Sequence, residues 1–336
     1  MKKVSLIVVF LLFIMSCVEP YSPTCDKPNL GDYSAPTVMT KYYDSNFGDV
    51  AVVLNTNISA KFCYGYISFE SPATGSVKII PISKESGKTI LSGLAVDESS
   101  GIAFTGERTE KKLIGTDLKT GERKVSVLLS HEPLKIYIFE DLNWGVTKIE
   151  KAVVVLAKGG YIGIWNENSL LDGKNEVDWF YTGISYPGDL YRLEDNFYII
   201  PYTSGTFIVL NTVEKTQQTF YIPYSSTSWY GTYIGWCNSA DMLCMPVNST
   251  KELLFFNTET EDWGGRIFID GMLFQIIDSG DIKIFSYFST PKIVVDVNGV
   301  KEVVYTPKSY ANILLVGDYL FVSDFGNNKL FTKKVK

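Results

Sequence analysis

The sequence predicts an all-β fold, a seven-bladed β-propeller built from four-stranded antiparallel blades. Short apolar runs alternate with clusters of Gly, Asn, Asp and Ser, and no amphipathic helical pattern follows residue 34. A unit of about 45 residues recurs along the chain, which is the length of one four-stranded propeller blade. Twenty-one tyrosines and 20 phenylalanines among 336 residues agree with a β-rich fold.

The first 16 residues have the layout of a signal peptide. Lys2 and Lys3 supply a positive start, and an almost unbroken apolar run extends from Val4 to Met15. This run is too short to span a bilayer as a helix. We therefore expect residues 1–16 to direct export and to be removed.

The residues that end this segment, Ile14-Met15-Ser16-Cys17, resemble the lipobox of bacterial lipoproteins. The resemblance implies that Cys17 receives acyl chains such as palmitate and becomes the mature N-terminus. Met15 departs from the small or β-branched residue preferred at its position, and the alternative is a plain secretory peptide. With lipidation, the protein is anchored in the cell envelope, facing the periplasm or the cell surface.

The net charge indicates which classes of partner are expected, and the positions of the prolines indicate where the folded domain begins. The chain has 31 basic and 37 acidic residues and a net charge of −6, which becomes −8 once Lys2 and Lys3 are removed. Only four of the basic residues are arginines, so nucleic acid is not an expected partner. Residues 17–34 contain Pro20, Pro23 and Pro28 and read as an extended tether. The propeller domain is expected to occupy residues 35–336.

Four cysteines remain after Cys17: Cys25, Cys63, Cys237 and Cys244. An even number in an exported protein permits disulfide bonds. Cys237 and Cys244 flank a turn-like stretch and are one candidate pair, Cys25 and Cys63 are the other, and both pairs could instead be small buried apolar residues. The chain has no CxxC motif and a single histidine, which argues against a Cys/His zinc site.

Two segments show the repeated unit most clearly. Residues 193–212 and 239–260 each contain an apolar strand, a proline, a polar turn, a second apolar strand and then Asn-Thr. With the prolines as markers, equivalent positions fall at Leu54, Thr105, Ala157, Pro201, Pro246, Ser286 and Ser323. Seven units therefore fit the chain, and six or eight blades or a pair of β-sandwiches are the alternatives. Asn298-Gly299 predicts a type I′ hairpin turn in the sixth unit.

Two of these units resemble a known group of repeats. GLAVDESSGIAF at residues 93–104 and VGDYLFVSDFGNN at residues 316–328 are similar to the NHL, YVTN and gluconolactonase-like repeats. The resemblance implies propeller architecture, and because that group includes both binding proteins and enzymes it does not fix a function.

The enzymatic alternative is a hydrolase or lactonase. In lactonase-type propellers, a divalent cation on the channel axis is held by Asp, Glu and Asn side chains from separate blades. Acidic residues near predicted strand ends could act as such ligands or as a carboxylate pair: Asp97, Asp117, Glu194, Asp195, Asp241, Asp278, Asp281, Asp318 and Asp324. Most of them fall in turns, where Asp is favoured because it hydrogen-bonds to nearby backbone. A Ser-His-Asp triad would need His131, and no GxSxG motif accompanies it.

Aromatic clusters are the better indication of a binding surface. Six Tyr and Trp residues lie between 221 and 236, and five aromatic residues lie between 179 and 191. Many of them are expected in the core, but rings on polar loops suit sugar faces and protein hot spots. The candidate ligand-binding residues are Tyr186, Tyr224, Trp229 and Tyr230.

The favoured function is therefore a non-catalytic binding or scaffold module, lipid-anchored outside the cytoplasm, for a protein or glycan partner. A monomer is expected, because a closed ring leaves no long free sheet edge. The alternative is the extracytoplasmic hydrolase with a divalent metal or carboxylate site in the channel.

Overall fold

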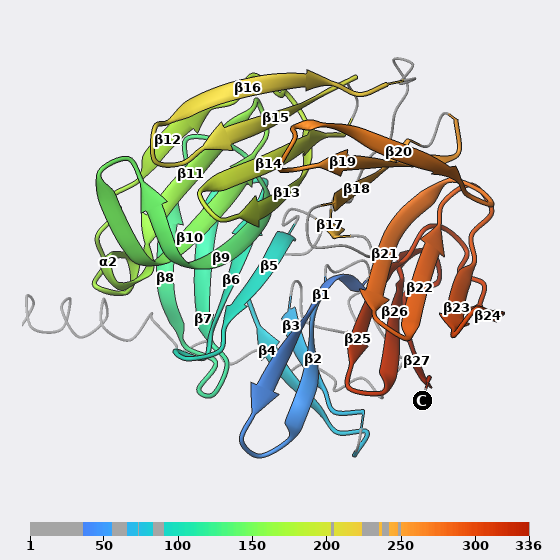
Figure 1. The fold of residues 1–336 in the computed structure, drawn as a ribbon. Helices are drawn as coiled ribbons and strands as arrows, with labels where there is room; N and C mark the ends of the chain where they lie inside the picture. The colour runs from blue at the N-terminus through green and yellow to red at the C-terminus, as the bar shows by residue number, and fades with distance from the viewer. Residues whose placement is uncertain are drawn as a thin grey trace, which may run out of the picture.

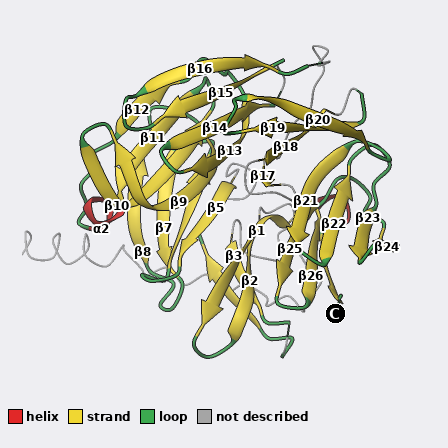
Figure 2. Ribbon diagram, viewed as in Figure 1, coloured by secondary structure: helices red, strands yellow, loops and turns green. Residues whose placement is uncertain are grey.

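The chain folds into seven antiparallel sheets arranged around a common axis (Figure 1, Figure 2), as the sequence predicts. The computed structural model describes residues 36–55, 66–72, 74–82, 91–202, 205–223, 235–236, 242–247 and 250–335. Each sheet is one blade, and its strands follow one another in chain order from the centre outward. The predicted tether and signal peptide, residues 1–34, lie outside the described residues.

The strands of the first three blades have the following bounds. Blade 1 contains β1 (Pro36–Asp44), β2 (Gly48–Asn55), β3 (Tyr66–Glu70) and β4 (Val77–Pro81). Blade 2 contains β5 (Leu91–Asp97), β6 (Ile102–Glu107), β7 (Lys112–Asp117) and β8 (Arg123–Leu128). Blade 3 contains β9 (Pro133–Trp144), β10 (Thr147–Ala157), β11 (Tyr161–Asn166), the short helix α2 (Glu167–Leu171) and β12 (Asp178–Tyr181).

The remaining four blades complete the ring. Blade 4 contains β13 (Pro187–Leu193), β14 (Asn196–Pro201), β15 (Thr206–Asn211) and β16 (Thr216–Tyr221). Blade 5 contains β17 (Gly235–Trp236), β18 (Met242–Val247), β19 (Glu252–Asn257) and β20 (Asp262–Phe268). Blade 6 contains β21 (Leu273–Ser279), β22 (Ile282–Tyr287), β23 (Ile293–Val297) and β24 (Val300–Tyr305). Blade 7 has three described strands, β25 (Asn312–Val316), β26 (Tyr319–Asp324) and β27 (Lys329–Lys334), with the 3-10 turn η1 (Phe325–Asn327) between the last two.

The core is divided among the seven interfaces between neighbouring blades. Each interface holds one cluster of buried apolar side chains, and the cluster of Ala51, Val53, Phe321 and Leu330 joins blade 7 to blade 1. Both faces of a blade are thus covered, which explains why runs such as residues 50–54 are apolar at every position. This last interface, between blades 7 and 1, closes the ring.

The structure confirms that the seven repeat markers are equivalent positions in successive blades. All seven, from Leu54 to Ser323, lie in the second strand of successive blades. The predicted hairpin is present as well, since Asn298 and Gly299 have φ values of 53° and 86° and join Val297 to Val300. Positive φ at both central residues is what a type I′ turn requires.

The meander divides the connections between two ends of the ring. Connections from first to second strand and from third to fourth strand lie at one end, which we call the turn face. Connections from second to third strand and from each blade to the next lie at the other end, which we call the loop face. The chain begins β1 on the loop face, because Pro36 pairs with Asn55 at the end of β2.

Candidate functional site

Blade 3 departs from the repeat at the turn face. Its first hairpin has strands of 12 and 11 residues, whereas the second strands of the other blades have six to eight. The same blade carries the only α-helix of the described residues, in an 11-residue connection between β11 and β12. In a repeat fold, insertions concentrated on one face of one unit often mark a binding face. The two insertions therefore mark the turn face of blade 3 as the candidate site.

The long hairpin is fixed to blade 4 by hydrogen bonds at its tip. The backbone N–H of Gly145 donates to the Thr212 carbonyl oxygen at 2.8 Å. Asn143 Nδ2 donates to Asp195 Oδ1 at 2.9 Å, and Arg192 Nη2 donates to the Asp141 carbonyl oxygen at 2.7 Å. Because three residues of the hairpin, Asp141, Asn143 and Gly145, are hydrogen-bonded to blade 4, the position of the hairpin relative to that blade is fixed.

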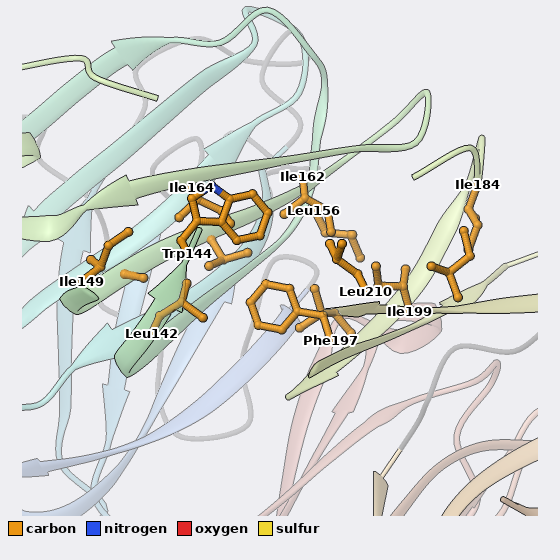
Figure 3. Close-up of a cluster of buried hydrophobic side chains, with 14 residues drawn as sticks. Leu142, Trp144, Ile149, Leu156, Ile162, Ile164, Ile184, Phe197, Ile199 and Leu210 are labelled. Carbon is orange, nitrogen blue, oxygen red and sulfur yellow. The ribbon is translucent and has the colours of Figure 1, made fainter. Parts of the chain in front are cut away.

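The inner side of this hairpin is part of the core between blades 3 and 4. Leu142, Trp144 and Ile149 are buried there and pack with Ile164 and Phe197 in one cluster (Figure 3). Phe180 meets Trp144 edge to face, with ring centroids 6.1 Å apart. The hairpin extension is therefore a packed wall and not a loose arm.

The second wall is the connection that contains α2. Asn166 caps the helix, since its side-chain oxygen accepts the N–H groups of Asn168 and Ser169. Asn175, beyond the helix, accepts a hydrogen bond from Trp165 Nε1 at 3.1 Å. These contacts fix both ends of the connection on blade 3.

A cleft of about 740 Å³ lies between the two walls. Its volume is in the range of small-molecule and side-chain binding sites. It is lined by Trp144, Gly145, Val146, Thr147, Ile149, Ile164, Asn166, Ser169, Asn175, Glu176, Val177, Asp178 and Lys215. The inner part is apolar and the rim is polar, an arrangement suited to an apolar group that carries a polar end.

Three side chains set the electrostatics of the cleft. Asp178 Oδ2 accepts hydrogen bonds from Trp144 Nε1 at 2.7 Å and from Lys215 Nζ at 2.5 Å. The Lys215 ammonium also lies 4.8 Å from the centroid of the Trp144 ring. Partial burial acts to raise the pKa of Asp178, but the hydrogen bonds from Lys215 and Trp144 outweigh it and the pKa lies below its usual value. With the exposed Glu176 added, the cleft has a net charge of −1 and favours a cationic group.

Among the residues that line the cleft, Gly145 is the one whose identity the geometry restricts most clearly. Its φ is +62°, and a Cβ placed on it would lie 3.1 Å from Lys215 Cε. A side chain here would strain the turn and displace Lys215 from Trp144 and Asp178. The cleft therefore depends on a glycine at the hairpin tip.

The carboxylates that the sequence raised as metal or catalytic candidates mostly serve turns. Asp97 accepts the N–H groups of Ser99 and Ser100 and forms an ion pair with Lys151 at 2.8 Å. Burial acts to raise the pKa of Asp97, but these contacts outweigh it and hold the pKa far below its usual value. Asp117 accepts two N–H groups of its own turn. Asp278 and Asp324 each accept one turn N–H, and Asp195 accepts Asn143 as described above. Glu194, Asp281 and Asp318 lie in first-hairpin turns, and Asp241 lies outside the described residues.

The described part of the chain contains no group of three His, Cys, Asp or Glu side chains placed to hold a metal ion. Within the same ranges, no helix has the length and apolar character needed to cross a membrane.

One of the four predicted ligand-binding aromatics can be placed. Tyr186 lies on the loop face between blades 3 and 4, is exposed, and has the Lys158 ammonium 5.4 Å from its ring centroid. Lys158 and Arg108 both pair with Glu132, and despite partial burial these contacts keep the pKa of Glu132 below its usual value. Tyr224, Trp229 and Tyr230 lie outside the described residues.

His131 occupies a structural position on the loop face. Its ring stacks on Tyr161 with centroids 3.7 Å apart and meets the edge of Trp179 at 4.9 Å. Burial and the nearby charge of Lys111 lower the pKa of His131. The lowered pKa favours the neutral imidazole, which packs as an aromatic ring.

Of the cysteines, only Cys244 belongs to the described residues. It is fully buried in β18 and is disulfide-bonded. Its partner lies outside the described residues, as do Cys17, Cys25, Cys63 and Cys237. The pairing of Cys244 with Cys237 and that of Cys25 with Cys63 remain predictions.

Comparisons with known proteins identify the fold but no family. No protein-family model matches the chain, and no curated protein matches it by sequence. A chain in the crystal structure of the mitotic checkpoint complex superposes with a TM-score of 0.66 and 11% identity, covering 94% of this chain and 95% of that one. BamB from Moraxella catarrhalis superposes with a TM-score of 0.54 and 11% identity, covering 90% and 99%. At this identity the likeness shows the propeller fold alone.

The cleft itself was not predicted from the sequence. One signal was present: Asn166 precedes Glu167, Asn168 and Ser169 and then two leucines. Asn at the start of such a stretch is a helix N-cap pattern. This cap would have located the irregular connection of blade 3, whereas the interval of 52 residues before the marker Ala157 differs little from the 51 residues before Thr105.

Proposed function

We propose that the protein is a lipid-anchored, extracytoplasmic propeller that binds a protein partner at the turn-face cleft of blade 3 and catalyses no reaction. The observation that carries the proposal is the pair of insertions that build the cleft. The long β9–β10 hairpin and the α2 connection come from one blade, lie on one face, and enclose a common space. Neither insertion is needed to close the ring, because the other blades pack without one.

The chemistry of the cleft favours a protein partner over a glycan. A sugar stacks on an open aromatic face, but the Trp144 ring is only 5% exposed and its edge is engaged by Asp178. The fully exposed Val146 at the hairpin tip and the acidic rim suit a segment with an apolar residue beside a lysine or arginine. The similarity to a chain of the mitotic checkpoint complex supports an assembly role for this fold in general.

Binding is favoured over hydrolysis because five of the eight described candidate carboxylates, Asp97, Asp117, Asp195, Asp278 and Asp324, already have structural roles. Asp97 and Asp117 hold turns, and Asp178 is neutralised by Lys215. A general acid or base needs a carboxyl whose pKa is poised near neutrality, whereas the pKa values of these three are lowered.

Site-specific photocrosslinking in cells that make the protein tests the partner. A photoreactive phenylalanine analogue at Val146 should give one defined protein adduct, because this side chain lies at the edge of the cleft. The same analogue at Val300, which is exposed on the turn face of blade 6, is the matched control and should give none. Glu176→Lys should abolish the adduct at Val146. Adducts at both positions, or at neither, would contradict a partner at this cleft.

The anchor is tested separately by metabolic labelling with radioactive palmitate. Label should be incorporated into the native chain and lost from Cys17→Ala. Incorporation that survives the substitution would refute lipidation at Cys17.

A further inference from the structure

Four consecutive blades place a large apolar side chain at the same exposed position. The last residues of the outermost strands β8, β12, β16 and β20 are Leu128, Tyr181, Tyr221 and Phe268, and they are 68%, 57%, 80% and 76% exposed. These strands lie on the outside of the ring (Figure 1), and the four residues all sit where the strand reaches the loop face. We call this set the apolar rim.

The pairing pattern shows that the four positions are structurally equivalent. Each rim residue is paired with the first residue of the neighbouring third strand: Lys112, Tyr161, Thr206 and Glu252. The residue after each rim position then donates its N–H to the residue just before that strand, as in Leu129 to Lys111 at 2.7 Å and Ile222 to Gly205 at 2.8 Å. Thr182 to Gly160 and Ile269 to Lys251 repeat the bond at 2.7 and 2.9 Å.

The four residues of the apolar rim lie at one level of the ring. Blades related by rotation about the ring axis hold equivalent residues at one height along that axis, so the rim residues lie near a common plane. A plane that touches four blades at once matches a flat surface, whereas a globular partner covers a compact patch of about 800 Å². Isolated exposed apolar residues are normal, but a repeated set at one level needs a partner.

The two faces also differ in net charge: the loop face, which carries the apolar rim, is basic, and the turn face is acidic. The described loop-face connections contain six basic and three acidic residues, a formal net charge of +3: Arg108, Lys111, Lys158, Lys251, Lys292 and Lys308 against Glu110, Glu132 and Asp270. The described turn-face connections contain three basic and 12 acidic residues, a formal net charge of −9: Lys119, Lys174 and Lys215 against Glu98, Glu122, Glu167, Asp172, Glu176, Glu194, Asp195, Glu214, Glu259, Glu261, Asp281 and Asp318. An anionic surface would therefore attract the loop face and repel the turn face.

The chain also enters the ring on the loop face. Pro36 begins β1 there, 19 residues after Cys17, so a tether from a lipidated cysteine meets the same face that carries the rim. We propose that the loop face rests on the surface of an anionic lipid bilayer, with the apolar rim in the headgroup region and the turn-face cleft directed away from the membrane. Tyrosine and phenylalanine are suited to this interface, where their rings meet apolar chains and polar headgroups together.

This inference uses the proposed anchor only for the direction from which the chain arrives, and it does not use the cleft. The seven blades close on themselves within residues 36–335, so the mature polypeptide from Val18 to Lys336 holds the whole fold and can be prepared without lipid. Its flotation with vesicles of phosphatidylethanolamine and phosphatidylglycerol measures membrane binding by the propeller alone.

We expect this unlipidated chain to float with the anionic vesicles and to bind vesicles of phosphatidylcholine more weakly, since the basic excess of the loop face contributes only at an anionic surface. The triple variant Tyr181→Ser/Tyr221→Ser/Phe268→Ser should lower the partition coefficient by at least about tenfold. The control Val146→Ser/Val213→Ser/Val300→Ser removes exposed apolar residues of the turn face and should leave binding unchanged. Thermal unfolding of both triple variants checks that they are folded.

Two results would overturn the proposal. Either the native chain stays in solution with both kinds of vesicle, which would leave the apolar rim to a macromolecular partner, or the two triple variants lose binding equally. A second measurement covers a rim variant that fails to fold: hydrogen exchange of the native unlipidated chain with and without anionic vesicles should protect residues 182–186 and 269–272 and leave residues 145–147 unchanged. Failure of palmitate labelling at Cys17 would refute the anchor and would not alter either result.

Discussion

The two faces of the ring are built from the same repeat but are held in different ways. On the turn face, most connections are short and closed by the side chain that precedes them: Asp117, Asn211 and Asn257 each accept two N–H groups of the following turn. On the loop face, contacts between blades dominate, such as Arg108 with Glu132 and Lys158 with Tyr186. Most turns of the turn face are therefore fixed locally, whereas the long β9–β10 hairpin of that face and the loop-face connections are fixed by their neighbours.

The charge asymmetry adds to this difference and does not follow from it. Asp and Asn are favoured at the first position of such turns because they hydrogen-bond to backbone N–H groups, but these residues end the strands and are not among the 12 acidic residues of the turn-face connections. Eight of those 12 residues are glutamates inside the connections. The loop face, with its basic excess, is the face available for contact with an anionic surface.

The largest expected effect comes from Glu70, at the end of β3 beside the turn face. It is fully buried, neither carboxyl oxygen has a hydrogen-bond partner among the described residues, and burial raises its pKa from 4.5 to about 9. Folding therefore retains the proton, and the free energy of unfolding should fall as pH rises from 4.5 to about 9, by up to about 6 kcal/mol in total. Glu70→Gln should remove this pH dependence and stabilise the protein at pH 8.

Urea unfolding at a series of pH values measures the effect. Glu122→Gln, an exposed residue of the turn face, is the matched control and should keep the native slope. An equal decline of stability with pH in Glu70→Gln and in the native chain would show that Glu70 is not the group responsible.

Next in size is Trp144, which joins the cleft to the core between blades 3 and 4. Trp144→Ala removes a buried ring and leaves Asp178 with one hydrogen-bond donor fewer, so unfolding should be easier by about 3–5 kcal/mol. Thermal unfolding measures this loss. Trp144→Phe keeps most of the packing and loses the Nε1 donor, and it should recover more than half of the stability. Equal losses in the two variants would mean that the ring packing contributes little.

A smaller effect is expected where a turn is closed by its first side chain. Asn257→Ala leaves the N–H groups of Glu259 and Thr260 without their acceptor and should cost about 1 kcal/mol. Glu259→Ala in the same exposed turn should change stability by less than about 0.5 kcal/mol. Chemical denaturation of both variants sharpens the comparison, and similar values for the two would argue against local closure of the turn.

The smallest effect on stability is expected at the rim. Tyr221→Ser changes a side chain that is almost fully exposed at the end of β16, so the free energy of unfolding should stay within about 0.5 kcal/mol of the native value. Differential scanning calorimetry without lipid measures this. A loss comparable to that of Trp144→Ala would mean that the rim residues hold the loop face together and are not a free contact surface.

The fold could be predicted from the sequence because short segments of the chain determine it. The marker positions from Leu54 to Ser323 all fall in second strands, since each blade repeats the same strand and turn signals within about 45 residues. Asn298-Gly299 specifies its own turn without help from the rest of the chain. Such local strand and turn signals can be recognised in a single sequence.

The candidate site could not be predicted in the same way. The cleft depends on Lys215 of blade 4 lying over Trp144 of blade 3, two residues 71 positions apart that meet only when the blades stack. The apolar rim is equally invisible in sequence, because Leu128, Tyr181, Tyr221 and Phe268 are four ordinary strand residues until the ring places them at one level. Tyr186, one of the predicted ligand-binding residues, is exposed in a loop whose Ser, Pro and Gly residues are local signals.

The three described strands of blade 7 bear on how this ring could be cut and rejoined. β27 ends at Lys334 on the turn face, whereas β1 begins at Pro36 on the loop face of the adjacent blade. A peptide joining these two points must run the full height of a blade beside β27, where the described residues supply no fourth strand and where the other six blades have one. A circularly permuted chain opened at the Gly145-Val146 turn would therefore need a linker with strand character, and a flexible glycine linker of the same length would not supply that strand.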